Sequence, residues 1–447
     1  RRNVSDIRNQ DWMMGKVKGK KINVVTLGCS KNVVDSEHVM AQLAAAGYDV
    51  VFDSNGTEVR TVVVNTCGFI GDAKEESINT ILGFVRAKEE GAIDRLFVIG
   101  CLSERYAEEL RREIPEVDAY FGARDFSGVV RALTGSEGGA PATERMLTTP
   151  GHYAYLKISE GCNWRCAYCA IPLIRGPHVS VPEEQVLEEA GRLVRRGVKE
   201  LIVVAQDTTY YGVDLYGERR LGRLLRRLAA IPGVEWVRLH YTYPTGFPDD
   251  VLAAMREEPK ICRYIDIPLQ HIADRQLSAM RRGITKRGTE ELIARLRREV
   301  PGIAIRTTLL VGFPGESEED FAELTDFVER QRFERLGVFP YSAEEGTPSA
   351  EMADDVPEEV KQARVERIME LQRNISHEAN VARIGRKLRV VVDRREGDYY
   401  VARSEYDSPE VDQEILIPVA EGRLLPGEFR VVVVTACEEY DLYGRLA

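Results

Sequence analysis

The sequence predicts an α/β protein in three parts: an N-terminal parallel-sheet domain, a partial (β/α)6 barrel and a small antiparallel β-barrel at the C-terminus. Strand-like and helical segments alternate twice, on either side of a Gly/Pro/Thr-rich stretch at 136–151 that is typical of a linker. Short alternating runs separated by turns replace this pattern near the C-terminus. The expected boundaries are 20–135, 152–380 and 384–447, and a chain of 447 residues is long enough for about three domains.

The amino-acid composition is typical of a globular protein of a reducing compartment. Hydrophobic residues make up 44% of the chain and charged residues 30%, as in ordinary globular proteins. No apolar run approaches the ~20 residues that cross a bilayer, and the polar start lacks the hydrophobic segment of a signal peptide. Because a chain of this length needs no disulfide staples, its eight cysteines favour a reducing, cytoplasmic compartment. The net charge of −11 argues against nonspecific attraction to nucleic acid and favours a basic partner.

The first domain has a cysteine at the end of each of three predicted strands. The strands are Lys21–Cys29, Arg60–Cys67 and Arg95–Cys101, and helical patterns follow at 36–46, 73–90 and 103–113. In a parallel sheet the ligand site lies outside the carboxyl ends of the strands, so the three cysteines should converge. Gly28, Gly68 and Gly100 would let the backbone approach a bulky group. Three inert buried cysteines are the alternative, but the repeated position favours a 4Fe–4S cluster with three protein ligands.

In the second domain the strand–helix alternation resumes. The strand candidates are 154–159, 200–206, 236–241, 264–269, 304–312 and 335–341, with helices between them such as 182–196 and 289–299. Six such units predict an open barrel, in which functional residues belong on the loops after the strands. Several of these strand ends are polar or rich in glycine: Gln206-Asp207, His240-Tyr241, Gln270-His271 and Gly312–Glu316.

The most specific motif follows the first of these strands. Cys162, Cys166 and Cys169 have the spacing C-x3-C-x2-C directly after the Gly161 turn. Three thiolates from one loop can hold three corners of a 4Fe–4S cube and leave the fourth iron open for a substrate or cofactor. A structural zinc loop is the alternative, but zinc needs a fourth ligand, and the nearest candidate, His178, lies beyond a Pro-Gly turn.

The end of the chain has a different pattern. Residues 357–383 predict a long amphipathic helix, and the runs 387–393, 399–403, 414–418 and 429–435 predict a barrel of about five strands. Residues 384–447 contain nine Lys and Arg against thirteen Asp and Glu. An RNA-binding barrel would need a basic stripe, so the acidic composition favours a basic protein target and makes direct RNA binding secondary.

From about residue 20 the chain resembles the methylthiotransferases of the radical S-adenosylmethionine (SAM) class, with a TRAM-like barrel at the C-terminus. The family's N-terminal motifs match Thr26–Asn32, Asp35–Glu37, Val64–Gly68 and Val98–Cys101. One branch of the family modifies an adenosine in tRNA, and the RimO type modifies an aspartate of a small-subunit ribosomal protein. The segments that resemble the RimO type are Cys169–His178, Ile265–His271, Tyr406–Asp412 and Tyr440–Gly444.

The resemblance implies two 4Fe–4S clusters and a mechanism. Cys162, Cys166 and Cys169 would hold the cluster that reduces SAM to methionine and a 5′-deoxyadenosyl radical, which takes hydrogen from the aspartate β-carbon. Cys29, Cys67 and Cys101 would hold the auxiliary cluster, whose free iron carries or supplies the sulfur that a second SAM methylates. Tyr168 matches the family's aromatic residue near the adenine. Strand position alone makes Gln206 and Arg306 candidates for contact with SAM.

Several partners and alternatives accompany this interpretation. An electron donor and a sulfur source are needed, and the ribosomal protein could be modified either free or within the ribosome. The alternative activities are methylthiolation of a tRNA adenosine and a non-enzymatic role as an iron–sulfur carrier or RNA-binding module. Cys262 and Cys437 receive no role in either cluster.

Overall fold

The computed structural model describes residues 21–54, 56, 58–135 and 139–447. The chain divides between Met146 and Leu147 into two compact units. The polar start of the chain and residues 136–138 of the expected linker lie outside the described residues. Within the described residues, no helix has both the length and the apolar character needed to cross a membrane.

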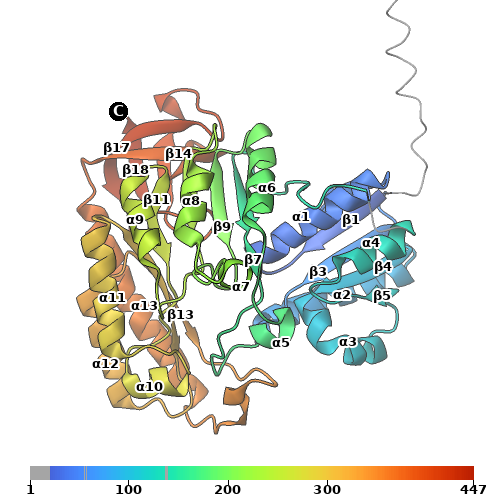
Figure 1. The fold of residues 1–447 in the computed structure, drawn as a ribbon, viewed down its shortest axis with the longest axis horizontal. Helices are drawn as coiled ribbons and strands as arrows, with labels where there is room; N and C mark the ends of the chain where they lie inside the picture. The colour runs from blue at the N-terminus through green and yellow to red at the C-terminus, as the bar shows by residue number, and fades with distance from the viewer. Residues whose placement is uncertain (1–20, 55, 57, 136–138) are drawn as a thin grey trace, which may run out of the picture. The chain divides into compact units, whose positions relative to one another are not determined.

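The first unit is a doubly wound α/β fold (Figure 1). Five parallel strands run in the order β2-β1-β3-β4-β5. Their bounds are Lys21–Thr26 (β1), Asp49–Phe52 (β2), Thr61–Thr66 (β3), Arg95–Gly100 (β4) and Ala119–Tyr120 (β5). Helices α2 (Gly71–Glu89) and α3 (Cys101–Glu113) pack on one face, and α1 (Ser30–Ala45) and α4 (Phe126–Thr134) on the other. The parallel sheet is confirmed, and the edge strands β2 and β5 are additions to the prediction.

The second unit contains the predicted partial barrel. Six parallel strands run in the order β13-β12-β11-β10-β9-β6, so the sheet is open between β6 and β13. Their bounds are Tyr153–Lys157 (β6), Glu200–Val204 (β9), Trp236–Leu239 (β10), Ile261–Asp266 (β11), Ala304–Val311 (β12) and Arg335–Pro340 (β13). The main helices between them are α6 (Glu183–Arg195), α8 (Leu221–Ala229), α9 (Asp249–Glu257), α11 (Lys286–Glu299) and α12 (Glu318–Gln331). Alternate strand residues, such as Leu201 and Val203, form the hydrophobic core with these helices.

Shorter elements complete this region near the carboxyl ends of the strands. They are β7 (Ser159–Glu160), α5 (Ile171–Arg175), β8 (Val179–Ser180), α7 (Val213–Tyr216) and α10 (Asp274–Ala279). Helix α13 (Glu358–Val381) packs against β13 and leads into the last part of the chain.

The C-terminal barrel is closed, in the order β14-β15-β16-β18-β17. The strands are Lys387–Glu396 (β14), Tyr399–Ser404 (β15), Ile415–Pro418 (β16), Phe429–Cys437 (β17) and Leu442–Leu446 (β18). Neighbouring strands are antiparallel except β16 and β18, which pair in parallel. The prediction of a small barrel is therefore confirmed, and its fully antiparallel description is corrected at this one pair.

A loop of the C-terminal barrel, residues 404–413, packs on the face of the six-stranded sheet that lies opposite its helices. We call it the insertion loop. Arg238 donates hydrogen bonds to the carbonyl oxygens of Ser404 and Glu405, and the Tyr264 hydroxyl donates to Asp412 at 2.7 Å. Arg335 forms an ion pair with Asp407, which is fully buried. The insertion loop thus fills the open barrel with ion-paired side chains. A buried charge of this kind is stable only while its partner is present.

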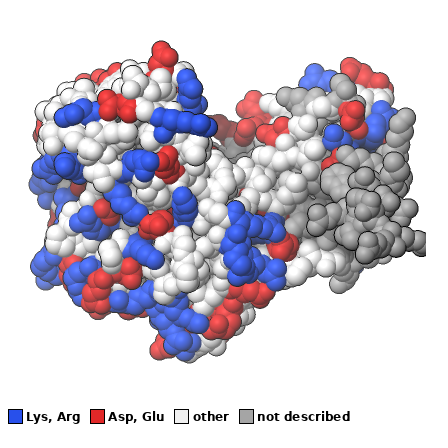
Figure 2. All heavy atoms as spheres, turned by 90° about the horizontal axis from the view of Figure 1, so that it is seen from above, with Lys and Arg blue, Asp and Glu red and all other residues white. Residues whose placement is uncertain are grey.

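Internal contacts involve part of the acidic residues of 384–447. Five of their acidic residues bond to groups of the six-stranded sheet or its flanking segments: Asp393, Glu405, Asp407, Glu410 and Asp412. Apart from these and the buried Arg403, eight acidic and eight basic residues remain in 384–447. Figure 2 accordingly shows basic and acidic side chains interspersed on the face drawn. Contacts with the six-stranded sheet and its flanking segments therefore account for the acidic excess of residues 384–447, and the charges that remain are balanced.

Part of the expected linker is anchored in the first unit. Arg145 forms an ion pair with Glu37 of α1, and both side chains are fully buried. The Met146 amide also donates to the Glu37 carbonyl oxygen at 3.1 Å. Residues 139–151 contain neither helix nor strand, as expected, but their composition gave no sign of this buried ion pair.

Candidate functional site

The loops that contain Cys29, Cys67 and Cys101 pack against one another at the carboxyl ends of β1, β3 and β4. A Cβ atom on Gly28 would lie 2.8 Å from the Cβ of Cys67. A Cβ on Gly68 would lie 2.7 Å from the Cα of Leu102, which follows Cys101. The structure therefore brings the three predicted residues to one edge of the sheet, and the close approach requires the glycines.

Asn32 in the first turn of α1 connects these loops. Its Nδ2 donates to the carbonyl oxygens of Leu27 at 2.8 Å and of Thr66 at 3.1 Å, and its Oδ1 lies 3.9 Å from the Cys101 sulfur. Burial raises the pKa of the Cys67 thiol, and the neighbouring Cys29 raises it further, while Lys31 lowers it. Lys31 is itself buried, so a cation lies beside these thiols.

The loop of Cys162, Cys166 and Cys169 follows β7 and is fixed by backbone hydrogen bonds. Gly161 has φ +77°, and a Cβ there would overlap the Pro177 carbonyl oxygen, so only glycine fits. The Cys162 amide donates to Gly176 O at 3.1 Å, and the Cys169 amide to Cys166 O at 3.1 Å.

Two distant segments hold the middle of this loop. The Ala167 amide donates to Met280 O, and its carbonyl oxygen accepts from the Ser349 amide, both at 2.9 Å. Burial raises the pKa of Cys162 and of Cys169 to about 12 each. These bare thiols would therefore stay protonated at neutral pH, whereas a bound metal deprotonates the thiols that coordinate it.

Two side chains that the sequence did not single out contact Cys166, and a third, Trp164, packs against one of them. The Tyr243 hydroxyl and the Arg282 Nη1 each lie 3.3 Å from the Cys166 sulfur. Trp164 stacks on Tyr243 with ring centroids 4.1 Å apart, and its indole N–H donates to Asp207 at 2.7 Å. Tyr243 comes from the loop after β10 and Arg282 from the turn between α10 and α11, and no spacing in the sequence linked them to Cys166.

The structure places the candidate SAM-binding residues in different surroundings. The Tyr168 hydroxyl accepts a hydrogen bond from Arg282 at 3.2 Å, which places Tyr168 at the cysteine loop. The Gln206 Nε2 donates to Glu160 at 2.6 Å, and its buried Oε1 has no hydrogen-bond partner. Burial alone would raise the pKa of Glu160, but Lys157 and Arg175 outweigh burial and lower it to about 2. Glu160 is therefore an anion that orients Gln206, and the free Oε1 is an available acceptor.

Arg306 does not join this group. It is the third residue of β12, and it pairs with Asp266 and with Asp412 of the insertion loop, both at 3.3 Å. Arg306 therefore joins the ion pairs between the sheet and the insertion loop. These contacts do not support the expected contact with SAM.

Among the other polar residues at strand ends, one contacts the cysteine loop and the others contact different segments. Asp207 joins the cysteine loop through Trp164. His240 instead contacts Ser408 of the insertion loop at 2.8 Å. The His271 Nε2 lies 3.8 Å from Glu316, which in turn accepts from Arg364 at 2.9 Å, so this pair packs between β12 and α13.

Both cysteine sets have the donors that an iron–sulfur cluster needs. All eight cysteines are free thiols, and six of them lie in the two sets. Over residues 21–447, apart from the five undescribed positions, no three His, Cys, Asp or Glu side chains are placed to bind one metal ion. Each thiolate of a cluster binds a different iron, so its ligand set spans more space than that of a single ion.

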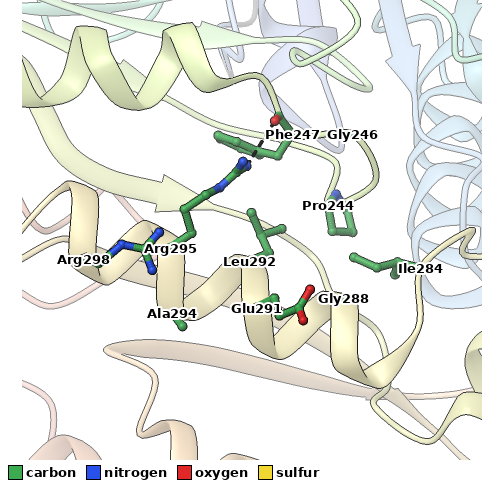
Figure 3. Close-up of a pocket in the computed structure, with 10 residues that line it drawn as sticks. All are labelled: Pro244, Gly246, Phe247, Ile284, Gly288, Glu291, Leu292, Ala294, Arg295 and Arg298. Atoms are coloured by element: carbon green, nitrogen blue, oxygen red, sulfur yellow. Dashed lines mark hydrogen bonds between the residues drawn. The ribbon is translucent and has the colours of Figure 1, made fainter.

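A surface pocket of about 530 Å³ lies beside the loop after β10, and none of the cysteines lines it (Figure 3). Its walls include Pro244, Phe247 and Leu292, and Arg295 crosses it to donate to the Phe247 carbonyl oxygen at 3.2 Å. The pocket therefore lies outside the candidate site.

Comparisons with known proteins agree with this architecture. Residues 156–328 match the Radical SAM superfamily, residues 21–122 match the uncharacterized protein family UPF0004, and residues 384–447 match the TRAM domain. The cobalamin-binding radical SAM methyltransferase TsrM from Kitasatospora setae has a similar fold, with a TM-score of 0.54, 15% identity and 74% of each chain covered.

Curated relatives are similar over almost the whole chain. A protein from Bacteroides thetaiotaomicron named "Ribosomal protein uS12 methylthiotransferase RimO" is 53% identical over 431 residues, which cover 96% of this chain and 99% of the relative. One of the same name from Porphyromonas gingivalis is 55% identical over 95% of this chain and 99% of the relative. With this identity over its full architecture, the chain belongs to the RimO family of radical SAM methylthiotransferases, which use 4Fe–4S clusters and SAM.

Proposed function

We propose that this protein transfers a methylthio group to the β-carbon of an aspartate in ribosomal protein uS12. The observation that supports it best is the pair of cysteine triads, each gathered by its own fold, in a chain more than 50% identical to relatives named for this reaction. Cys162, Cys166 and Cys169 would hold the cluster at which SAM binds. Cys29, Cys67 and Cys101 would hold the auxiliary cluster. When bound, the two clusters and SAM supply the electron transfer, hydrogen removal and methylthio group.

The chain's own residues would position the reactants and exclude water. The stack of Trp164 on Tyr243, fixed through Asp207, forms an aromatic wall beside Cys166. The ionised Glu160 holds the Gln206 amide so that its Oε1 can accept a hydrogen bond from SAM. Tyr168 would lie near the cofactor through its place between Cys166 and Cys169.

A basic target agrees with the surface beside the cysteine loop. Residues 342–360 contain seven acidic and no basic residues. This segment contacts the cysteine loop through the hydrogen bond from Ser349 to Ala167. Its acidity, and not that of the C-terminal barrel, is the feature that supports a substrate rich in Lys and Arg.

The remaining partners follow from the reaction. An electron donor and a sulfur source are required, and uS12 would be met either free or within the ribosome. The reducing cytoplasm is the setting that the free cysteines favour. Methylthiolation of a tRNA adenosine is the alternative activity, but nine Lys and Arg against thirteen Asp and Glu in residues 384–447 disfavour the basic stripe that RNA binding needs.

Mass spectrometry after anaerobic reaction with SAM, reductant and sulfide tests the proposal. Purified uS12, intact small subunits and bulk tRNA are offered in parallel. We expect a methylthio mass gain on one aspartate-containing peptide of uS12, together with 5′-deoxyadenosine. A gain on tRNA adenosine alone would refute the assignment of the substrate, and clusters without 5′-deoxyadenosine would refute the enzymatic role.

A further inference from the structure

Arg282 is a buried cation with an unusual set of partners. Only 3% of the residue is exposed, and among the residues that the structure describes no carboxylate pairs with it. Its Nη2 donates to Pro268 O at 2.5 Å, its Nη1 contacts Cys166 and Tyr168, and its Nε has no acceptor. Because an isolated buried charge is costly, such a guanidinium needs an anion close by.

The backbone around Arg282 fixes where its side chain lies. Arg281, with φ +58°, ends the turn after α10 in the left-handed region. The Arg282 amide then donates to Leu277 O at 2.9 Å, and its carbonyl oxygen accepts from the Tyr243 hydroxyl at 3.1 Å and from Thr245 at 2.9 Å. The guanidinium also lies over the Tyr243 ring, 4.3 Å from its centroid. The side chain is therefore held against Cys166 before any cofactor binds.

The missing anion is of the kind that the cysteine loop would create. A 4Fe–4S core with three thiolate ligands has a net negative charge. This charge becomes more negative by one when the core accepts an electron. Cys166 is the ligand that Arg282 touches, at 3.3 Å, and the Tyr243 hydroxyl reaches the same sulfur. Hydrogen bonds to ligand sulfurs and nearby charge are two of the factors that set the reduction potential of such clusters.

We propose that Arg282 is a positioning residue that makes the radical SAM cluster easier to reduce, by hydrogen-bonding the Cys166 sulfur and supplying the counter-charge of the reduced state. This inference rests on the proposed function, because it requires a cluster on Cys166. The step is the gain of one electron from an external donor, and no bond forms or breaks. The Tyr243 hydroxyl lies 3.3 Å from the same sulfur but shares its one proton with the Arg282 carbonyl oxygen, so Tyr243 has the smaller effect.

Redox titration of the full-length holoenzyme, followed by electron paramagnetic resonance, tests the proposal. The signal that disappears in Cys166→Ala identifies the cluster concerned. At the wild-type midpoint potential, we expect Arg282→Gln to lower the ratio of reduced to oxidised cluster about tenfold, a shift of about 59 mV to more negative potential for one electron. Arg282→Lys, which keeps the charge but loses the planar fork, and Tyr243→Phe should shift it less, in the same direction.

Arg281→Gln is the matched control, because it removes the same charge from the exposed neighbouring residue and should leave the midpoint unchanged. An unchanged midpoint in Arg282→Gln at wild-type iron content would overturn the proposal. If that variant fails to fold or to bind iron, Arg282→Lys and Tyr243→Phe decide, and the absence of a shift in both would overturn it. A wild-type protein without any signal that depends on Cys166 would instead refute the proposed function.

Discussion

Each of the two cysteine sites gathers three thiols, but the two sites do so in different ways. In the first unit, each cysteine follows a different strand, and the loops touch directly where Gly28 and Gly68 meet their neighbours. In the second unit, one loop supplies all three, and distant residues such as Met280 and Ser349 fix it through the Ala167 peptide. The first site is therefore made by sheet register, and the second by the elements that surround a short loop.

The surroundings differ accordingly. A lysine, Lys31, lies by the thiols of the first unit and comes from the residues next to Cys29. The cation of the second, Arg282, lies more than a hundred residues from Cys166 in the chain. A residue close to Cys29 in the chain thus supplies the cation of the first site, whereas tertiary structure supplies the cation of the second.

The largest expected effect separates the two sites chemically. Cys166→Ala should abolish formation of 5′-deoxyadenosine and of methylthiolated product, because SAM would have no cluster to reduce it. Cys67→Ala should abolish the product while 5′-deoxyadenosine still forms. Each variant should keep roughly half of the wild-type iron if the two clusters have equal size. Iron analysis and product chromatography measure this, and a Cys67→Ala variant that still makes product would remove the first site from the reaction.

Alanine at the turn glycines should have nearly as large an effect, confined to one site each. In Gly161→Ala the new methyl overlaps the Pro177 carbonyl oxygen, and in Gly100→Ala it lies 2.6 Å from the Thr66 carbonyl oxygen, both at positive φ. Backbone strain of about 1–3 kcal/mol then adds to a steric clash. We expect loss of the radical SAM cluster in the first variant and of the auxiliary cluster in the second.

Two matched controls separate the clash from the strain. Gly217 and Gly47 have φ +72° and +88°, and a Cβ would meet nothing within 4 Å at either position. Alanine there should cost about 1 kcal/mol in the free energy of unfolding and leave the iron content unchanged. If these controls also lost iron, positive φ alone, and not the packing of the loops, would explain the result.

The next effect tests whether the second site depends on the filling of its barrel. Glu200 is fully buried between Arg238, at 2.7 Å, and Arg403 of the C-terminal barrel, at 2.5 Å. Glu200→Gln leaves two buried guanidinium groups without this anion, and such a loss typically costs about 3–5 kcal/mol. Denaturant unfolding should show this loss, and Glu235→Gln, which affects an exposed pair with Arg389, is the control.

The same group predicts a pH dependence. Burial alone would raise the pKa of Glu200, but Arg403 and Arg238 together lower it to about 2, below its ordinary value of 4.5. Its ionisation therefore stabilises the fold above about pH 4.5, and this contribution, about 3 kcal/mol, is lost as the pH falls toward 2. The free energy of unfolding should fall over this range in the wild-type protein and fall less steeply in Glu200→Gln. Equal slopes would contradict the assignment.

The repeated and closely spaced cysteine motifs could be predicted from the sequence. The contacts between side chains that are distant in the chain could not. Strand-end cysteines and the C-x3-C-x2-C loop could be found because periodicity and spacing are local properties. The pairing of Arg306 could not be predicted, because a strand position does not reveal that the side chain meets Asp412 of the C-terminal barrel. For the same reason, composition did not reveal that Asp407 and Asp412 of the C-terminal barrel form internal ion pairs. Arg282 had no local signal at all.

The smallest effects concern the two cysteines outside the sites. Cys262 is the second residue of β11 and is fully buried beside Trp236 and Tyr264, so its thiol serves as a small apolar group. Cys262→Ala should cost about 1 kcal/mol through the small cavity that it leaves, and the half-buried Cys437 at the end of β17 should tolerate serine at lower cost. Both variants should keep the wild-type iron content and yield of 5′-deoxyadenosine. Loss of iron in either one would mean that a cluster recruits a fourth thiol, and the open coordination position on which the proposed reaction depends would then be closed.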